Sequence, residues 1–228
     1  MSFHSRLRPI QGRPGIHSAL AITSSIVSPW MSGEQVERVL EAFEPDWERI
    51  FALAAGALLS PVLWERINEK NLTARIPKDF LMALQVIHEA NCERNRQHKM
   101  VLLDAVRELN RLGIEPVLLK GAHALAGLEP DQDARILSDI DLIIPDGRAR
   151  EAQNHLISMG YYDQPLHEGK WHPEEYDGHQ MEPLFHPTLP AYLELHHYPH
   201  WKEYSENLVN YILSDLQPME LEGCHMKV

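Results

Sequence analysis

Apolar residues recur every three or four positions through much of the first half of the chain, a spacing typical of amphipathic helices. Residues 32–35, Ser-Gly-Glu-Gln, have the pattern of a capping box and precede the first of these segments. Pro61 lies where the first turn of a helix tolerates proline, and Gly113 is a residue that commonly ends one. Helices are predicted over residues 32–43, 46–58, from 60 onward, and 78–112.

The pattern changes near residue 114, where short apolar runs begin to alternate with helical segments. Strands are predicted at residues 116–119, 139–144 and 191–196, with helices at 122–128 and 146–160 between them. This order predicts an α+β fold with a mixed β-sheet, flanking helices and an N-terminal helical region. The predicted organisation is an irregular tail over 1–31, a helical region over 32–113 and an α/β core over 114–228.

The last part of the chain gives weaker signals. Residues 163–190 are rich in Pro, His and Glu and show no clear period. Residues 206–213 are predicted to be helical, and Cys224 and His225 are expected in a disordered tail.

Composition restricts the class of protein. The net charge is −12, from 21 basic and 33 acidic side chains, which disfavours general nucleic-acid binding. No apolar run approaches the ~20 residues that span a bilayer, so no membrane association is expected. With two cysteines, no disulfide framework is implied, and a cytoplasmic location is expected.

The apolar run ILSDIDLII contains two aspartates, Asp139 and Asp141. Residues two apart on a strand point to the same face, and paired carboxylates beside an apolar layer need a compensating charge. Divalent cations provide it, and two Mg²⁺ (or Mn²⁺) ions suit phosphoryl transfer. Glu194, in the strand-like segment AYLELHH, is the candidate third metal ligand, and His196 shares its face as a possible cleft residue.

A turn between a strand and a helix at Lys120 and Gly121 has features of a phosphate site. Glycine allows a close backbone approach, the N–H groups at a helix start attract anions, and a lysine adds positive charge. Arg135, four residues before Asp139, is a candidate for a bidentate phosphate contact. Lys120, Gly121 and Arg135 are therefore the predicted nucleotide-binding residues.

These motifs resemble those of the uncharacterised nucleotidyltransferase family, part of the DNA polymerase beta-like superfamily. The resemblance covers about residues 99–200 and rests on LLKGAHAL, RILSDIDLIIP, a helix ending in MGY, and LELHH. It implies a palm-like mixed sheet, two metal ions, and transfer of a nucleoside monophosphate from an NTP to a small-molecule or protein acceptor. Many relatives have Gly-Ser at the phosphate turn, whereas this chain has Gly121-Ala122. The resemblance also implies a helical C-terminal part of the core, which is expected to be short or truncated in this chain.

Other interpretations of the same residues remain open. The aspartates fit a solvated edge strand, Glu194 a salt bridge, Lys120 a solvated strand end, and Arg135 a pair with a nearby acid. The chain also fits a non-catalytic binding module of this fold with a protein partner, such as half of a toxin–antitoxin pair. Its 14 histidines permit a zinc hydrolase, although no HExxH motif occurs.

Asp141→Asn is expected to abolish activity while leaving the metal-free fold intact or more stable.

Overall fold

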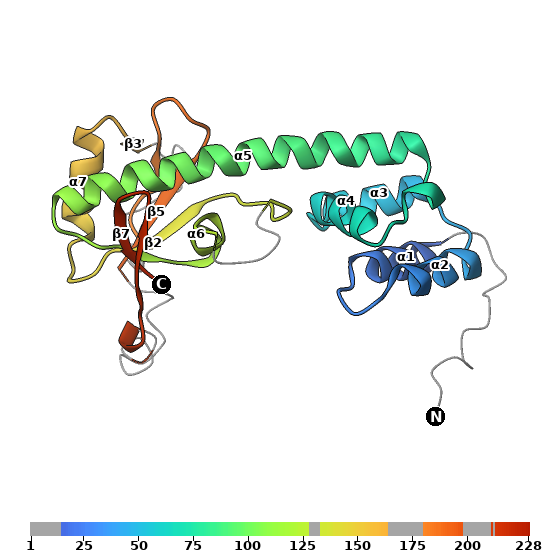
Figure 1. Cartoon of the computed structure of the whole chain (residues 1–228). Helices are drawn as coiled ribbons and strands as arrows, with labels where there is room; N and C mark the ends of the chain where they lie inside the picture. Colours follow the sequence, from blue (N-terminus) through green and yellow to red (C-terminus); the bar gives the residue numbers. More distant parts are fainter. Residues whose placement is uncertain (1–14, 128–132, 164–179, 198–210, 212) are drawn as a thin grey trace. The chain divides into compact units, whose positions relative to one another are not determined.

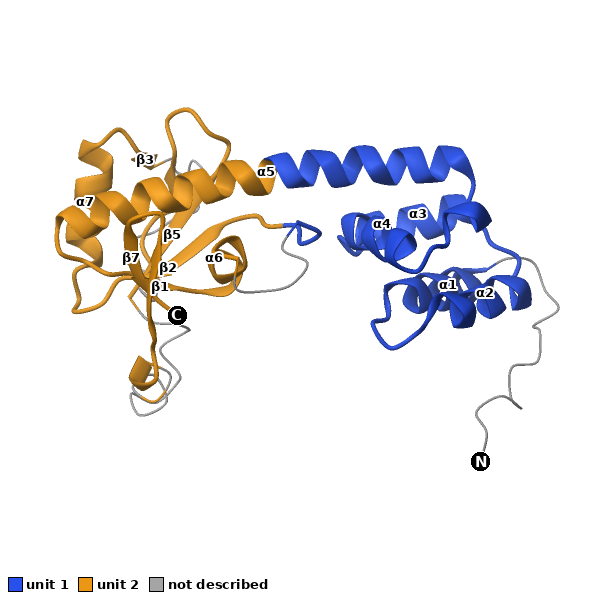
Figure 2. Cartoon of the chain, in the orientation of Figure 1, with its two compact units in different colours: residues 1–93, 133–136 blue, residues 94–132, 137–228 orange. Residues whose placement is uncertain are grey.

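The computed structural model describes residues 15–127, 133–163, 180–197, 211 and 213–228, and Figure 1 shows its elements. The chain divides into two compact units, coloured separately in Figure 2. Unit 1 comprises residues 1–93 and 133–136, and unit 2 comprises residues 94–132 and 137–228.

Unit 1 is helical and has its own apolar core. Buried side chains from its α-helices form this core, among them Ile22, Ile50 and Leu63. The ammonium group of Lys70 donates to three backbone carbonyls at the end of the first helix, at 2.6 to 3.2 Å, and so satisfies groups that a helix end leaves open. The elements are α1 (Ile16–Val27), α2 (Gly33–Ala42), α3 (Trp47–Gly56), α4 (Ser60–Glu69), η2 (Thr73–Arg75) and the start of α5 (Lys78–Arg111).

The predicted capping box is present at the start of α2. The Ser32 side chain accepts from the Gln35 N–H, and the Gln35 side chain accepts from the Ser32 N–H. The prediction of an irregular tail through residue 31 is wrong for residues 16–27, which form α1. Serines and a threonine lower the helix propensity of this segment, but Ile22 and Ile26 are fully buried, so tertiary packing determines the helix.

Helix α5 contributes residues to both units. It ends just before Gly113, which adopts a left-handed φ of 71°, as the predicted helix end requires. The two units divide at residues 93 and 94, inside α5, whereas the sequence prediction placed the change at residues 113 and 114. Helical periodicity continues without a break along α5, and it gives no sign of where the side chains change from one core to the other.

Unit 2 is built on a mixed sheet of seven described strands in the order β3-β4-β5-β2-β1-β7-β6. The β2–β5 and β1–β7 pairs are parallel, and the other pairs are antiparallel. The α+β prediction is therefore confirmed. The strands are β1 (Val117–Leu118), β2 (Ile140–Ile143), β3 (Tyr162–Asp163), β4 (Leu184–Phe185), β5 (Tyr192–His196), β6 (Pro218–Leu221) and β7 (Cys224–Lys227); the helices besides α5 include α6 (Lys120–Leu125) and α7 (Ala149–Ser158).

One face of the two central strands belongs to the core of unit 2. Ile140 and Leu142 of β2 and Leu193 and Leu195 of β5 are fully buried together with apolar residues of α5 and α7. Because successive side chains of a strand point to opposite faces, the intervening residues of β2 and β5 project from the other face. Asp141 of β2 is one of these intervening residues.

The C-terminal residues form a β-hairpin, so the prediction of a disordered tail at Cys224 and His225 is wrong. Cys224 and Met226 are buried, and β7 pairs in parallel with β1. The Asn110 side chain holds the hairpin, since it donates to the His225 carbonyl at 2.8 Å and accepts from the His225 N–H at 2.7 Å. These partners lie far earlier in the chain, which is why local sequence did not indicate them.

Two helix starts also differ from the predictions. Helix α6 begins at Lys120, one residue beyond the end of β1, and not at Ala122. Helix α7 begins at Ala149, because Asp146 has a left-handed φ of 60° and lies in the preceding turn. Most of the helix predicted over residues 206–213 lies outside the described residues.

Candidate metal centre

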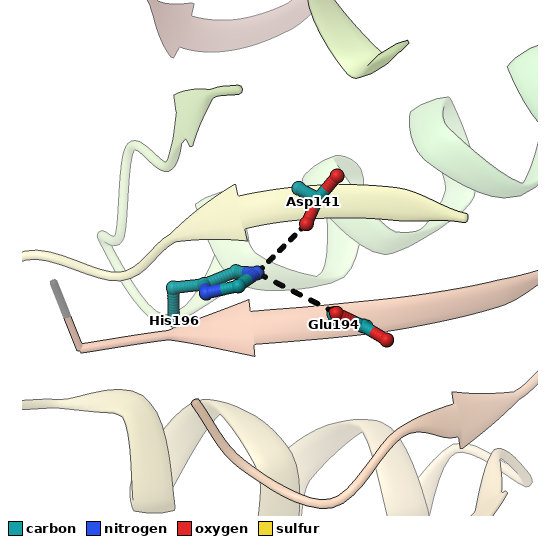
Figure 3. Close-up of side chains that lie close together, drawn as sticks. All are labelled: Asp141, Glu194 and His196. Carbon is teal, nitrogen blue, oxygen red and sulfur yellow. Dashed lines mark hydrogen bonds and ion pairs between the residues drawn. The ribbon is translucent and has the colours of Figure 1, made fainter. Parts of the chain in front are cut away.

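Asp141, Glu194 and His196 bring together three potential metal ligands on one face of the sheet (Figure 3). In the parallel pairing of β2 with β5, Asp141 lies opposite Glu194, and His196 follows two residues later on β5. Ligand atoms of the three side chains all lie within 4.8 Å of one another. Among the residues that the structure describes, no other group of three His, Cys, Asp or Glu side chains meets this spacing.

Asp141 is the buried centre of this group, with 0% of its surface exposed. Its Oδ1 accepts hydrogen bonds from Nζ of Lys120 at 2.8 Å and from Nε2 of His196 at 2.9 Å. Burial by itself would raise the pKa of the Asp141 carboxyl, but these hydrogen bonds and the nearby positive charge outweigh burial and hold the pKa below its usual value. Complete burial excludes the interpretation of Asp141 as a solvated edge residue.

Lys120 connects the strand-to-helix turn to the acidic strand. Its backbone has a left-handed φ of 42°, which is strained for a residue with a side chain. Burial favours a lower pKa for the ammonium, but the hydrogen bond and ion pair with Asp141 raise the pKa above its usual value. Lys120 therefore neutralises Asp141 in this structure, a contact that the sequence analysis did not foresee.

Glu194 has the opposite electrostatic environment. Partial burial and then the negative charges of Asp139 and Asp141 raise the pKa of its carboxyl above the usual value. Nε2 of His196 lies 3.8 Å from Oε2 of Glu194. Tyr192, which precedes Glu194 on the same face, also has a raised pKa, from burial and then from the charges of these acids. The alternation in the β5 sequence places Tyr192 on the same face as Glu194, although Tyr192 was not predicted as a site residue.

The other predicted residues lie around this group in different ways. Asp139 is half-buried, precedes β2, and accepts from the Ser138 hydroxyl at 2.8 Å; it is not one of the three clustered ligands. Arg135 is exposed and falls in unit 1, where its backbone carbonyl accepts from Asn91 at 3.1 Å. The roles predicted for Asp139 and Arg135 remain predictions.

Gly121 is buried in the turn at the start of α6. A Cβ atom at this position would lie 2.8 Å from Cδ2 of Leu137 and 3.6 Å from the backbone carbonyl oxygen of Asp139. The missing side chain therefore leaves room for the segment that leads into the acidic strand. Gly121 therefore has a packing role in addition to its predicted role in the close approach of the backbone to a phosphate.

The donor set suits a divalent cation. Two carboxylates and one imidazole are common ligands for divalent metals, and a cation would relieve the repulsion between Glu194 and its acidic neighbours. Oδ2 of Asp141 is buried and has no hydrogen-bond partner within the described part of the chain. A buried carboxylate oxygen without a partner costs free energy, so this atom also fits a ligand-binding role.

Comparison with known proteins relates most of the chain to one family. Residues 44–228 match the sequence model of the family described as uncharacterised nucleotidyltransferase. No curated protein and no solved structure shows significant similarity to the chain. Within the described residues, no helix combines the length and the apolar character needed to cross a bilayer.

Proposed function

The chain belongs to the uncharacterised nucleotidyltransferase family, and from this premise we propose that it transfers a nucleoside monophosphate from an NTP to a small-molecule or protein acceptor, with Mg²⁺ or Mn²⁺. The observation that carries the proposal is the meeting of Asp141 and Glu194, which lie opposite each other on neighbouring strands with carboxylate oxygens within 4.8 Å of each other. Lys120 and Gly121 lie at the adjacent strand end.

The proposed residue roles follow from position and charge. Asp141 and Asp139 hold two metal ions, and Glu194 ligates the catalytic ion and orients the acceptor hydroxyl. Gly121 and Lys120 bind the triphosphate, and Arg135 steadies a phosphate or the acidic strand. The ions, when bound, neutralise charge that develops on the transferring phosphoryl group.

The reaction is a substitution at phosphorus. The acceptor oxygen forms a bond to the α-phosphorus, the bond from that phosphorus to the β-bridging oxygen breaks, and pyrophosphate leaves. The hydroxyl proton is released to solvent by way of Glu194. The chain's contribution is the positioning of these groups, without a covalent intermediate.

Lys120 changes partner in this proposal. Its ammonium contacts Asp141 in the structure, but 59% of its side chain is exposed, so the side chain has room to move. With a metal ion held by Asp141, the Lys120 ammonium would be available to a phosphate oxygen.

The test combines binding with labelling. Metal-free protein is heated with each NTP, with and without Mn²⁺ or Mg²⁺, and a nucleotide that binds with metal raises the melting temperature. The protein is then incubated with α-³²P-labelled NTPs, Mn²⁺ and cell extract, and transferred label is followed on gels and by thin-layer chromatography. Asp141→Asn is the variant expected to lose transfer.

Asp163→Asn is the matched control, because it makes the same change from carboxylate to carboxamide at an exposed position of β3, the edge strand of the same sheet. It should retain transfer. If no nucleotide with either metal shifts the melting curve and no label moves, the catalytic proposal is wrong.

A second candidate is a non-catalytic binding module of the same fold. It is favoured by the Lys120–Asp141 ion pair, which neutralises the buried acid without any metal. This candidate predicts co-purification with a protein partner and an unchanged cellular phenotype for the Asp139→Ala, Asp141→Ala double variant. Loss of function in that variant, with partner binding retained, would favour the enzyme.

A further inference from the structure

The candidate metal centre contains a nitrogen atom that the predicted all-carboxylate site lacked. Nε2 of His196 lies 2.9 Å from Oδ1 of Asp141 and 3.8 Å from Oε2 of Glu194 (Figure 3). His196 is 2% exposed, so its ring is held by its surroundings. Its position on β5, two residues after Glu194, places both side chains on the same face.

The shorter of these spacings matches neighbouring ligands of a single octahedral ion, and the longer one is close to the range that such ligands span. Ligand atoms ~2.1 Å from such an ion lie about 3.0 Å apart at neighbouring vertices and about 4.2 Å apart at opposite vertices. The distance from Nε2 of His196 to Oδ1 of Asp141 has the neighbouring value, and its distance to Oε2 of Glu194 lies between the two. Small side-chain adjustments therefore place all three atoms around one ion.

The hydrogen bond between His196 and Asp141 shows which proton must move before His196 can bind a metal ion. A carboxylate only accepts, so Nε2 of His196 carries the proton in its contact with Asp141. When His196 binds an ion through Nε2, that proton is lost from Nε2 and the neutral ring carries its proton on Nδ1. Oδ2 of Asp141, which is buried and without a hydrogen-bond partner among the described residues, is a second oxygen available to metal.

We propose that His196 is a direct ligand of the metal ion that Asp141 and Glu194 share, and that its nitrogen makes this site select Mn²⁺ over Mg²⁺. Mg²⁺ strongly prefers oxygen ligands and keeps its waters, whereas first-row transition ions bind imidazole as well. Three protein ligands leave the remaining octahedral positions to water and phosphate oxygens. The inference rests on the proposed function, because the same ion would hold the nucleotide, but its test requires no turnover.

The first measurement is pulsed electron paramagnetic resonance on wild-type protein loaded with Mn²⁺. A directly bound histidine nitrogen gives ¹⁴N modulation, and protein labelled with ¹⁵N-histidine shows the corresponding change. A spectrum without histidine nitrogen coupling overturns the inference. This result does not depend on the folding of any variant.

The second measurement is calorimetric titration of metal-free protein with Mn²⁺ and with Mg²⁺. Wild-type protein should bind Mn²⁺ at least tenfold more tightly, and His196→Gln should lose roughly tenfold or more of its Mn²⁺ affinity while its Mg²⁺ affinity changes much less. His225→Gln is the control, because His225 is exposed on β7 and its contacts with Asn110 use backbone atoms.

The failures of the two proposals are distinguishable. Equal loss of both affinities in His196→Gln means that His196 only positions Asp141, and the selectivity proposal is then wrong. Nitrogen coupling without any thermal response to an NTP leaves the metal assignment standing and removes nucleotide transfer. A nucleotide response without nitrogen coupling removes the metal assignment alone.

Discussion

Strands β2 and β5 place one acid each at the same level of the sheet, yet the two acids have opposite electrostatic environments. Asp141 is fully buried and receives hydrogen bonds from Lys120 and His196, so its pKa is held below the usual value. Glu194 is less buried, and burial together with neighbouring negative charge raises its pKa. Neighbouring positions on parallel strands thus differ in whether the chain itself supplies the compensating charge.

The difference separates two tasks within one site. The chain keeps Asp141 charged by means of the Lys120 ammonium and the hydrogen bond from His196, so this acid contributes to the folded state even without metal. Glu194 has a nearby histidine but no lysine or arginine within ion-pair distance in the described residues, and its charge is best compensated from outside. A bound metal ion should therefore relieve charge repulsion mainly at Glu194. At Asp141 it should take the place of the Lys120 ammonium.

The largest expected effect belongs to Asp141→Asn in metal-free protein. It removes the charge that Lys120 and His196 surround and should lower the free energy of unfolding by about 2 kcal/mol. Urea denaturation with EDTA measures it. This replaces the expectation from sequence that the substitution leaves the fold unchanged or more stable.

Asp139→Asn is the control for this prediction. Asp139 is half-buried and bonds to the Ser138 hydroxyl, so its substitution should change the free energy of unfolding by less than about 0.5 kcal/mol. Equal stability of the Asp141 and Asp139 variants would contradict the contrast between the two strands.

Removal of the Lys120 ammonium should have a smaller effect on stability than Asp141→Asn. Lys120→Met should lower the free energy of unfolding by about 0.5–1 kcal/mol, because more than half of the lysine side chain is exposed and solvent screens the ion pair. The same substitution should increase the stabilisation by Mn²⁺, since the ion no longer competes with an ammonium. Thermal melts with and without Mn²⁺ measure both effects.

Lys120→Gly separates the charge from the backbone. Both variants lack the ammonium, but glycine adopts the left-handed φ of 42° without strain, so the glycine variant should be more stable than the methionine variant by about 1 kcal/mol. A glycine variant that is less stable than the methionine variant would mean that the side-chain stem, and not the backbone, dominates at this position.

Glu194→Gln should stabilise metal-free protein, in contrast to Asp141→Asn. The substitution removes a partly buried charge that is repelled by Asp139 and Asp141, and the expected gain near neutral pH is about 0.5 kcal/mol. Urea denaturation with EDTA gives the sign. A loss of stability would mean that Glu194 already has a compensating partner in the absence of metal.

The pH dependence of the free energy of unfolding should distinguish the two acids by the smallest of the expected effects. The raised pKa of Glu194 means that its destabilising charge is complete above that pKa and disappears as the pH falls toward its unfolded value of about 4.3. The lowered pKa of Asp141 means that its contribution is complete above its unfolded value of about 3.9 and is lost as the pH falls through the folded pKa.

Unfolding curves recorded from about pH 7 to about pH 3.5 with EDTA test both signs. The advantage of Glu194→Gln over wild type should shrink first as the pH falls, and the deficit of Asp141→Asn should shrink only at the acidic end. If the deficit of Asp141→Asn shrank before the advantage of Glu194→Gln, the electrostatic environments described for the two acids would be wrong.

Much of the fold followed from local sequence. The reciprocal bonds of Ser32 and Gln35, the end of α5 at Gly113, and strands at residues 140–143 and 192–196 agree with the patterns that predicted them. Local signals failed where distant packing decided the structure, as in α1, whose polar residues obscure its buried isoleucines, and in β7, which pairs with β1.

The sequence by itself determined that an apolar strand carries acids, that a second strand carries Glu194 and His196, and that glycine follows a lysine at a strand end. Alternation along a strand fixes which side chains share a face, and this information is local. Only the tertiary structure decided that β2 and β5 are parallel neighbours in the register that sets Asp141 beside Glu194. It also decided that Lys120 donates to Asp141, because burial and charge depend on contacts between residues far apart in the chain.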